Sequence, residues 1–154
     1  KEFEHTLFRT PELYFGYKFA QNRNQLGSDE GFQPEKIVKY NVPSDIVSNK
    51  FYPIGNWKNH KDSMELTESI GSIKVSFNAK EVNIVTKNNA QLEIFLDGMP
   101  LTEEHAGSDI SFGNKMDLSN AGMYNIISSK NSISHTMEIL IEGEGFQAFT
   151  FTFG

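Results

Sequence analysis

Cysteine is absent from this sequence of 154 residues. Its absence excludes disulfide bonds, thiolate zinc sites, CxxC redox motifs and a cysteine nucleophile, because all of these need a thiol. Basic residues are also in the minority: 14 Lys and Arg stand against 20 Asp and Glu, which gives a formal net charge of −6. Such a chain repels phosphate backbones, and no basic run with interleaved aromatic residues offsets the repulsion. We therefore expect no nucleic-acid partner.

Long apolar runs are missing as well. The longest apolar stretches are only a few residues, whereas a membrane-spanning helix needs about 20. The sequence starts with Lys-Glu-Phe-Glu-His rather than Met, and no basic-then-apolar signal peptide follows. We expect no membrane insertion by this chain, and we interpret it as a piece of a larger protein whose exporting or anchoring segment would lie upstream.

The composition fits a single β-rich domain. A chain of this length buries about 68–70% of its unfolded surface, which is enough for an independent core. Its 13 Phe, five Tyr and one Trp put much of the apolar content into aromatic side chains, which favour strands, while 12 Gly and five Pro supply turns. A second domain is not expected.

Alternating apolar and polar residues predict several strands. The clearest pattern covers 72–77, and a hairpin through the polar connection 78–80 is expected to join it to 82–86. Strands so close together, with turns between them, indicate an all-β antiparallel sandwich or jelly roll rather than βαβ units. Further strands are predicted at 91–96, 123–128, 137–142 and 149–153. The interior face is predicted to consist of Ile73, Val75, Phe77, Ile94, Ile139, Phe149, Phe151 and Phe153.

The first sixty residues are less regular. Short strands are predicted at 14–17 and 37–40, and only this part of the chain has room for a helix. The segment 49–59 holds the single Trp together with Pro and Gly, so it is expected to form a loop or a strand end.

Motifs for catalysis, metals and nucleotides are missing. His5, His60, His105 and His135 lack metal-ligand spacing, and neither a G-x-S-x-G elbow nor a glycine-rich phosphate loop occurs. We expect no metal, no cofactor and no enzyme activity. Two alternatives stay open: a hydrolase using paired carboxylates, or a structural calcium ion. The candidate pairs for either role are Asp29 with Glu30 and Glu103 with Glu104, and Asp97 or Asp109 would join them in a calcium site.

Aromatic and amide side chains are the remaining candidates for a binding site. Sugars stack an apolar face on Trp or Tyr while Asn, Asp and Gln hydrogen-bond their hydroxyls. Trp57 beside Asn56, with Tyr52 five residues earlier, is the candidate cluster, and Tyr14 and Tyr17 are the reserve candidates. A lone Trp can equally anchor the core of a small sandwich, so both interpretations of Trp57 are carried forward.

Several short segments of the sequence occur in the same order as in one protein family. They are Arg9–Tyr17, Gly55–Trp57, Leu96–Gly98, Tyr124–Ile127 and Phe146–Gly154. Together they resemble the C-terminal module of DipZ-type thioredoxin-family proteins, where a membrane domain and a thioredoxin-like domain with a CxxC motif precede this module. The resemblance implies a jelly-roll fold similar to carbohydrate-binding modules, with residues 1–154 as one domain and residues 1–12 as the linker from the preceding domain.

The resemblance also implies an extracytoplasmic location and a non-catalytic role beside thiol–disulfide chemistry, whose redox site would lie in the thioredoxin-like domain. Two binding functions are then open. The module could bind a glycan or cell-wall ligand, or it could pack on the thioredoxin-like domain of the parent chain as a protein-interaction module. The hydrolase alternative has only unplaced carboxylates in its favour.

Overall fold

The computed structural model describes residues 8–154, which form an all-β domain with one short helix. All pairings between its named strands are antiparallel, which confirms the predicted fold class. The elements are β1 (Leu13–Tyr14), α1 (Tyr17–Ala20), β2 (Ile37–Tyr40), β3 (Phe51–Asn59), β4 (Met64–Leu66), β5 (Ile70–Lys87), β6 (Ala90–Leu96), β7 (Met99–Pro100), β8 (Lys115–Leu118), β9 (Gly122–Glu142) and β10 (Gln147–Phe153). No helix in the described residues is long and apolar enough to span a membrane.

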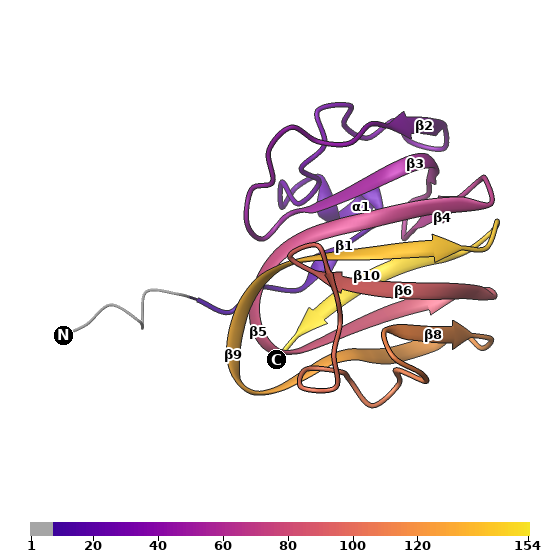
Figure 1. Cartoon of the computed structure of the whole chain (residues 1–154). Helices are drawn as coiled ribbons and strands as arrows, with labels where there is room; N and C mark the ends of the chain where they lie inside the picture. Colours follow the sequence, from indigo (N-terminus) through magenta and orange to yellow (C-terminus); the bar gives the residue numbers. More distant parts are fainter. Residues whose placement is uncertain (1–7) are drawn as a thin grey trace.

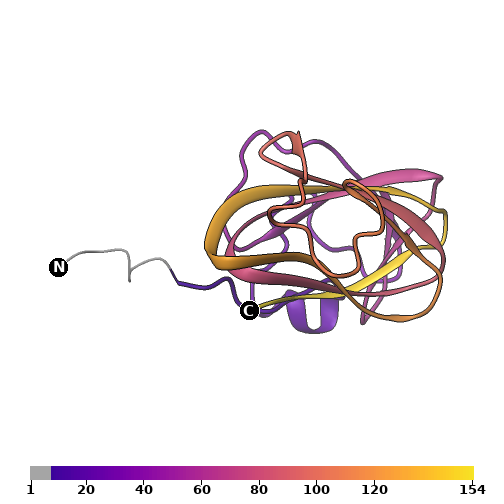
Figure 2. The same cartoon turned by 60° about the horizontal axis from the view of Figure 1, so that its bottom comes forward.

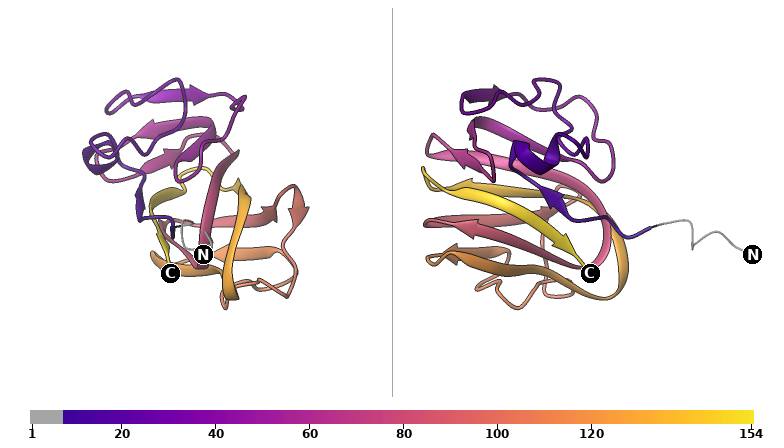
Figure 3. Two further views of the ribbon diagram at one scale, coloured as in Figure 1. Left: turned by 90° about the vertical axis from the view of Figure 1, so that its left-hand side faces the viewer. Right: turned by 180° about the vertical axis from the view of Figure 1, so that it is seen from behind.

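Two long strands, β5 and β9, organise the sandwich. They pair with each other along most of their length, with register shifts between Ala79 and Glu81 and between Val82 and Asn83. Both strands curve round one end of the molecule near these shifts, so each contributes to both layers (Figures 1 and 3). One layer contains β2, β3, the first half of β5, the second half of β9, β6 and β8. The other contains β10 with the remaining halves of β5 and β9.

The sandwich is partly closed along one side. β4 pairs with β3 of one layer and with β10 of the other, so it connects the two layers at that edge. β1 continues this edge by pairing with β10 in the register Leu13 to Phe151 and Tyr14 to Thr150. The helix α1 follows on the outer surface (Figure 2).

The core lies between the layers and is rich in aromatic rings. Phe15 packs on Phe51 and Phe151 with ring centroids 4.6 and 5.2 Å apart, and Phe77 stacks on Phe153 at 6.0 Å. Most of the predicted interior face is confirmed as buried: Ile73, Val75, Phe77, Ile94, Ile139, Phe151 and Phe153.

Phe149 does not belong to this face, and its predicted burial was wrong. β10 pairs Ala148 with Thr86 but Thr150 with Val85, so one extra residue is inserted as a bulge. The bulge changes the phase of the alternation. As a result Ala148 and Phe151 are both buried, while Phe149 is only half-buried.

Two other predictions about the elements were wrong. The expected hairpin at 78–80 is a bend inside the continuous strand β5. The strand predicted at 14–17 is instead β1 followed by α1, because the chain turns at Gly16. The segment 49–59 also forms more regular structure than expected, since residues 51–59 form β3 and pair with β2, β4 and β5.

Candidate functional site

Trp57 lies in the core. Its exposed fraction is 0%, and its ring meets Phe146 edge-on at 6.3 Å between centroids. The indole N–H donates to the carbonyl oxygen of Ile54 at 3.0 Å, so the polar edge of the ring is satisfied inside the protein. With both ring faces enclosed, Trp57 offers no stacking surface in this structure. The structure therefore favours the core interpretation of Trp57.

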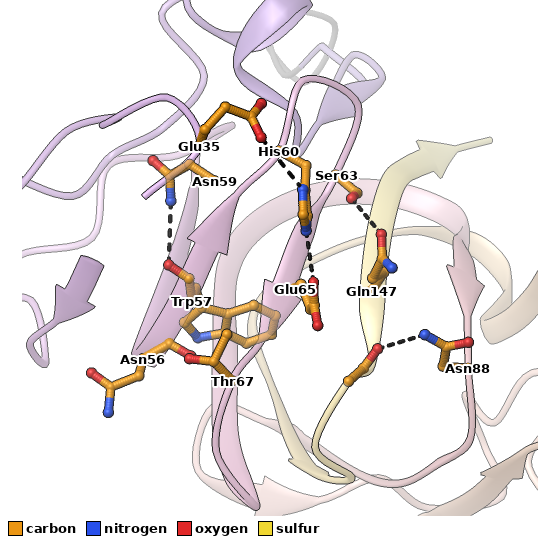
Figure 4. A network of polar contacts seen from close by, with 11 residues as sticks. Glu35, Asn56, Trp57, Asn59, His60, Ser63, Glu65, Thr67, Asn88 and Gln147 are labelled. Atoms are coloured by element: carbon orange, nitrogen blue, oxygen red, sulfur yellow. Dashed lines mark hydrogen bonds and ion pairs between the residues drawn. The ribbon is translucent and has the colours of Figure 1, made fainter. Parts of the chain in front are cut away.

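The other members of the predicted cluster face different surroundings. Asn56 is half-buried, and Figure 4 shows its side chain directed away from the indole ring. Its backbone N–H donates to Oε2 of Glu68 at 2.7 Å, and its carbonyl oxygen accepts hydrogen bonds from Thr67. Tyr52 is only 2% exposed. The three residues do not form one aromatic platform.

Tyr52 instead contributes to the wall of a polar cleft of about 460 Å³. Its hydroxyl oxygen accepts a hydrogen bond from the backbone N–H of Val47 at 2.7 Å. Its ring lies directly on Gly27, where a Cβ atom would come within 2.2 Å of the ring carbon Cζ. Only glycine permits this close approach, which fixes the ring against the 27–30 loop.

Acidic and amide groups make up much of the remaining wall of this polar cleft. The lining includes Asp29, Glu30, Asn41 and Asp45. The Glu30 carboxylate accepts hydrogen bonds from the backbone N–H and the side-chain amide of Asn41, at 3.0 and 3.1 Å. These bonds join the 27–30 loop to the segment after β2. Asp29 and Glu30, one of the predicted carboxylate pairs, thus lie in a cleft with an amide and a phenol.

A second hollow, the aromatic cleft, has a volume of about 220 Å³ and lies between β1, α1 and β10. Three rings line it: Tyr14, Phe19 and Phe149. The rings of Tyr14 and Phe19 are 5.3 Å apart at 46°, and Phe19 is 42% exposed. Tyr14 was a reserve candidate from the sequence. Phe19 and Phe149 were not, because neither the short helix nor the bulge left a clear signal in the sequence.

Close backbone packing shapes the aromatic cleft. The N–H groups of Tyr17 and Lys18 donate to the carbonyl oxygens of His60 and Lys61, at 3.3 and 3.1 Å. A Cβ atom on Gly16 would stand 2.2 Å from the Lys61 carbonyl oxygen, so this approach requires glycine. The start of α1 is thereby fixed against the turn between β3 and β4.

Tyr17, the other reserve candidate, does not line the aromatic cleft. Its hydroxyl donates to Oε2 of Glu35 at 2.8 Å, and this hydrogen bond to the carboxylate raises the tyrosine's pKa. Glu35 also lies 3.9 Å from Nδ1 of His60, whose Nε2 is 2.7 Å from Oε1 of Glu65 (Figure 4). Tyr17 therefore takes part in a polar network beside the aromatic cleft.

The histidines and carboxylates of the described part of the chain are not grouped as a metal centre requires. Among residues 8–154, no group of three or more His, Asp or Glu side chains is placed to hold a metal ion. His105 and His135 are 6.2 Å apart at their ring centroids, and Nδ1 of His135 is 2.5 Å from Oδ2 of Asp97. Two hydrogen bonds lower the pKa of Asp97. The larger effect comes from the Thr136 backbone N–H and the smaller from His135. His5 lies outside the described residues.

Comparison with known proteins identifies the family to which the chain belongs. Residues 10–154 match the family model described as the thioredoxin-like C-terminal domain. Protein DipZ of Mycobacterium bovis and Protein DipZ of Mycobacterium tuberculosis are each 26% identical over 146 residues, covering 94% of this chain but 18% of the relative. The chain thus spans about a fifth of the length of these relatives.

The solved structures that resemble the fold are more distant. A family two carbohydrate esterase from Clostridium thermocellum, in complex with cellohexaose, has a TM-score of 0.40 and 15% identity, covering 60% of this chain and 27% of the esterase. A family 6 carbohydrate-binding module has a TM-score of 0.36 and 13% identity, covering 79% of this chain and 95% of the module. Likeness at this level carries no argument about a ligand.

Proposed function

Because this chain belongs to the family of thioredoxin-like C-terminal domains, we propose that it is a non-catalytic accessory module of an extracytoplasmic thiol–disulfide interchange protein and that its polar cleft binds glycan. The chain has no cysteine, so thiol–disulfide exchange would take place in a thioredoxin-like domain of the parent chain. The role of this module is then to hold a ligand near that domain.

The polar cleft is the observation that carries the glycan proposal. Its volume of about 460 Å³ falls within the range of about 300–1,000 Å³ typical of small-molecule sites. Sugar hydroxyls both donate and accept hydrogen bonds, and they pair well with carboxylates and amides. Asp29, Asp45 and Asn41 supply such groups from two loops. A polyhydroxylated ligand is the chemistry that this wall matches.

Tyr52 does not have the sugar-stacking role that the sequence predicted for it. Its ring is buried, so it cannot stack on a sugar. Its hydroxyl oxygen accepts from Val47, and the hydroxyl proton is still available to donate to a ligand in the cleft. We therefore assign Tyr52 a hydrogen-bonding role, while Asn56 and Trp57 lie outside the lining of this cleft.

A glycan array probed with the 154-residue chain, followed by calorimetric titration of the best oligosaccharide, tests the proposal. Tyr52→Phe keeps the ring and removes the hydroxyl, and Asp45→Ala removes a carboxylate. Each is expected to weaken binding about three- to tenfold, as the loss of one ligand hydrogen bond does. Phe149→Ala in the aromatic cleft is the control and should leave affinity unchanged. Absence of binding to any arrayed glycan, or binding insensitive to both polar-cleft variants, would overturn the proposal.

A further inference from the structure

The geometry of the aromatic cleft points to a second ligand of a different class. We propose that this cleft binds an extended polypeptide segment in which one large apolar side chain is flanked by carboxylates. The inference does not depend on glycan binding, because the aromatic cleft shares no lining residue with the polar cleft. Its support comes from the size and lining of the cleft, the charges round its rim and the bulge that exposes one of its rings.

The size and lining of the cleft suit one apolar side chain. Its volume of about 220 Å³ lies below the range of about 300–1,000 Å³ typical of small-molecule sites. Rings from Tyr14, Phe19 and Phe149 form its walls. Phe19 is 42% exposed. Insertion of an aromatic or aliphatic side chain would remove this apolar surface from water, as anchor residues do at protein interfaces.

Cationic side chains lie over the rings that line the cleft, although the chain as a whole carries a net charge of −6. The guanidinium carbon of Arg23 lies 5.0 Å from the Tyr14 ring centroid and 5.4 Å from that of Phe19, and Nζ of Lys18 lies 5.3 Å from the Phe19 centroid. Lys61 forms part of the lining itself. The carboxylate of Asp62 also lies in the lining and Glu12 accepts a hydrogen bond from the Tyr14 hydroxyl, while Glu35 and Glu65 belong to the neighbouring network of Tyr17 and His60. Carboxylates on a partner would complement the cationic side chains.

A sugar would fit this cleft less well than a peptide. The Tyr14 hydroxyl already donates to Oε1 of Glu12 at 3.0 Å, so it is not available to a ligand as a free donor. Arg23 lies over the rings of Tyr14 and Phe19, where its guanidinium can pair with a carboxylate of a peptide, a group that a neutral sugar lacks. The lining also contains no amide side chain and one carboxylate, Asp62, so it offers fewer partners for sugar hydroxyls than the polar cleft does.

The bulge in β10 places one of the three rings in the wall of the cleft. In a regular strand Phe149 would share the buried face of Phe151, whereas the extra residue at Ala148–Thr150 turns Phe149 outwards beside Tyr14. Bulges are known to re-aim side chains in this way and often lie near functional sites. Phe149 is therefore only half-buried, and a partner's apolar side chain would cover the rest of its ring.

Fluorescence anisotropy with a labelled seven-residue peptide tests the inference. The probe carries a central phenylalanine between four glutamates, and two control peptides replace either the phenylalanine with alanine or the glutamates with lysines. We expect saturable binding of the probe, at least about tenfold weaker binding of both controls, and weakening of the probe at high salt. Equal binding of the alanine peptide, or no binding of the probe at about 1 mM, would overturn the proposal.

Variants of the chain locate the site. Phe149→Ala and Phe19→Ala should each weaken probe binding at least about tenfold, and Arg23→Gln should weaken it about threefold and reduce the salt dependence. Phe19 lies on the surface, so its variant keeps the test valid if Phe149→Ala is unstable. Tyr52→Phe is the control and should bind the probe normally. Unchanged probe binding by both phenylalanine variants would refute the inference, and a glycan that displaces the probe would assign the cleft to a sugar instead.

Discussion

The indole N–H of Trp57 donates a hydrogen bond to the carbonyl oxygen of Ile54, 3.0 Å away on the same strand. Between them, Gly55 adopts a positive φ of +108°, a conformation that most side chains do not permit. The local bend in β3 brings the acceptor to the indole, so the only polar atom of the side chain is paired within the protein. A buried Trp with a satisfied N–H is a structural residue.

Substitution of Trp57 should therefore affect stability. We expect Trp57→Ala to lower the free energy of unfolding by about 3–5 kcal/mol, because it empties a large space beside Phe146 and removes the hydrogen bond to the Ile54 carbonyl. Urea denaturation followed by circular dichroism measures the change. Glycan affinity, corrected for the folded fraction, should stay constant. A stable Trp57→Ala variant that has lost glycan binding would instead restore Trp57 as a ligand contact.

Two phenylalanines of the final strand provide a matched pair. Phe151 is 0% exposed, and Phe151→Ala should cost about 3–5 kcal/mol of stability. Phe149 is half-buried at the bulge, and Phe149→Ala should cost less than about 1.5 kcal/mol because little core packing is lost. Thermal and urea unfolding of both variants give the comparison. Equal losses would show that Phe149 belongs to the core and would weaken the assignment of the aromatic cleft.

Sequence pattern predicted the interior of the strands better than their ends. Alternation at 72–77 identified Ile73, Val75 and Phe77 correctly, because a half-buried strand imposes a period of two. It could not distinguish the bend at 78–80 from a hairpin, since polar residues suit both. It also could not reveal the bulge at Phe149, because Phe-Thr-Phe-Thr-Phe keeps a perfect alternation and the shift depends on pairing with β5.

The candidate site was less predictable than the fold. Tyr14 was selected from the sequence, but its neighbours in the aromatic cleft come from a four-residue helix and from β10, 135 positions further along the chain for Phe149. The polar cleft combines the loop at 27–30 with residues after β2 and with Tyr52. Such clefts depend on which distant loops come together in the fold, and local sequence patterns do not predict those contacts.

Thiol–disulfide exchange should be absent from this chain. Exchange requires an attacking thiolate, and the sequence contains no cysteine. Reduction of insulin by dithiothreitol should therefore proceed at the same rate with and without the protein, and the turbidity of the precipitating insulin follows it. A thioredoxin run in parallel is the positive control. Acceleration by this chain above the protein-free rate would contradict the proposed division of labour with a thioredoxin-like domain.

The contact between Asp97 and β9 should contribute more to stability while Asp97 is ionised. Hydrogen bonds from the Thr136 backbone N–H and from His135 lower its pKa below the ordinary value of 3.8. A lowered folded-state pKa means that this extra contribution is present above about pH 4 and is lost as the pH falls through the folded pKa.

Asp97→Asn tolerates the positive φ of +51° and still accepts a hydrogen bond from Thr136. We therefore expect wild type to be more stable than Asp97→Asn near neutral pH, and the difference to shrink below about pH 4 in urea denaturation. Glu144→Gln, in the exposed turn before β10, is the control. A wild-type advantage that grew as the pH fell below about 4 would contradict the assigned role of the ionised carboxylate.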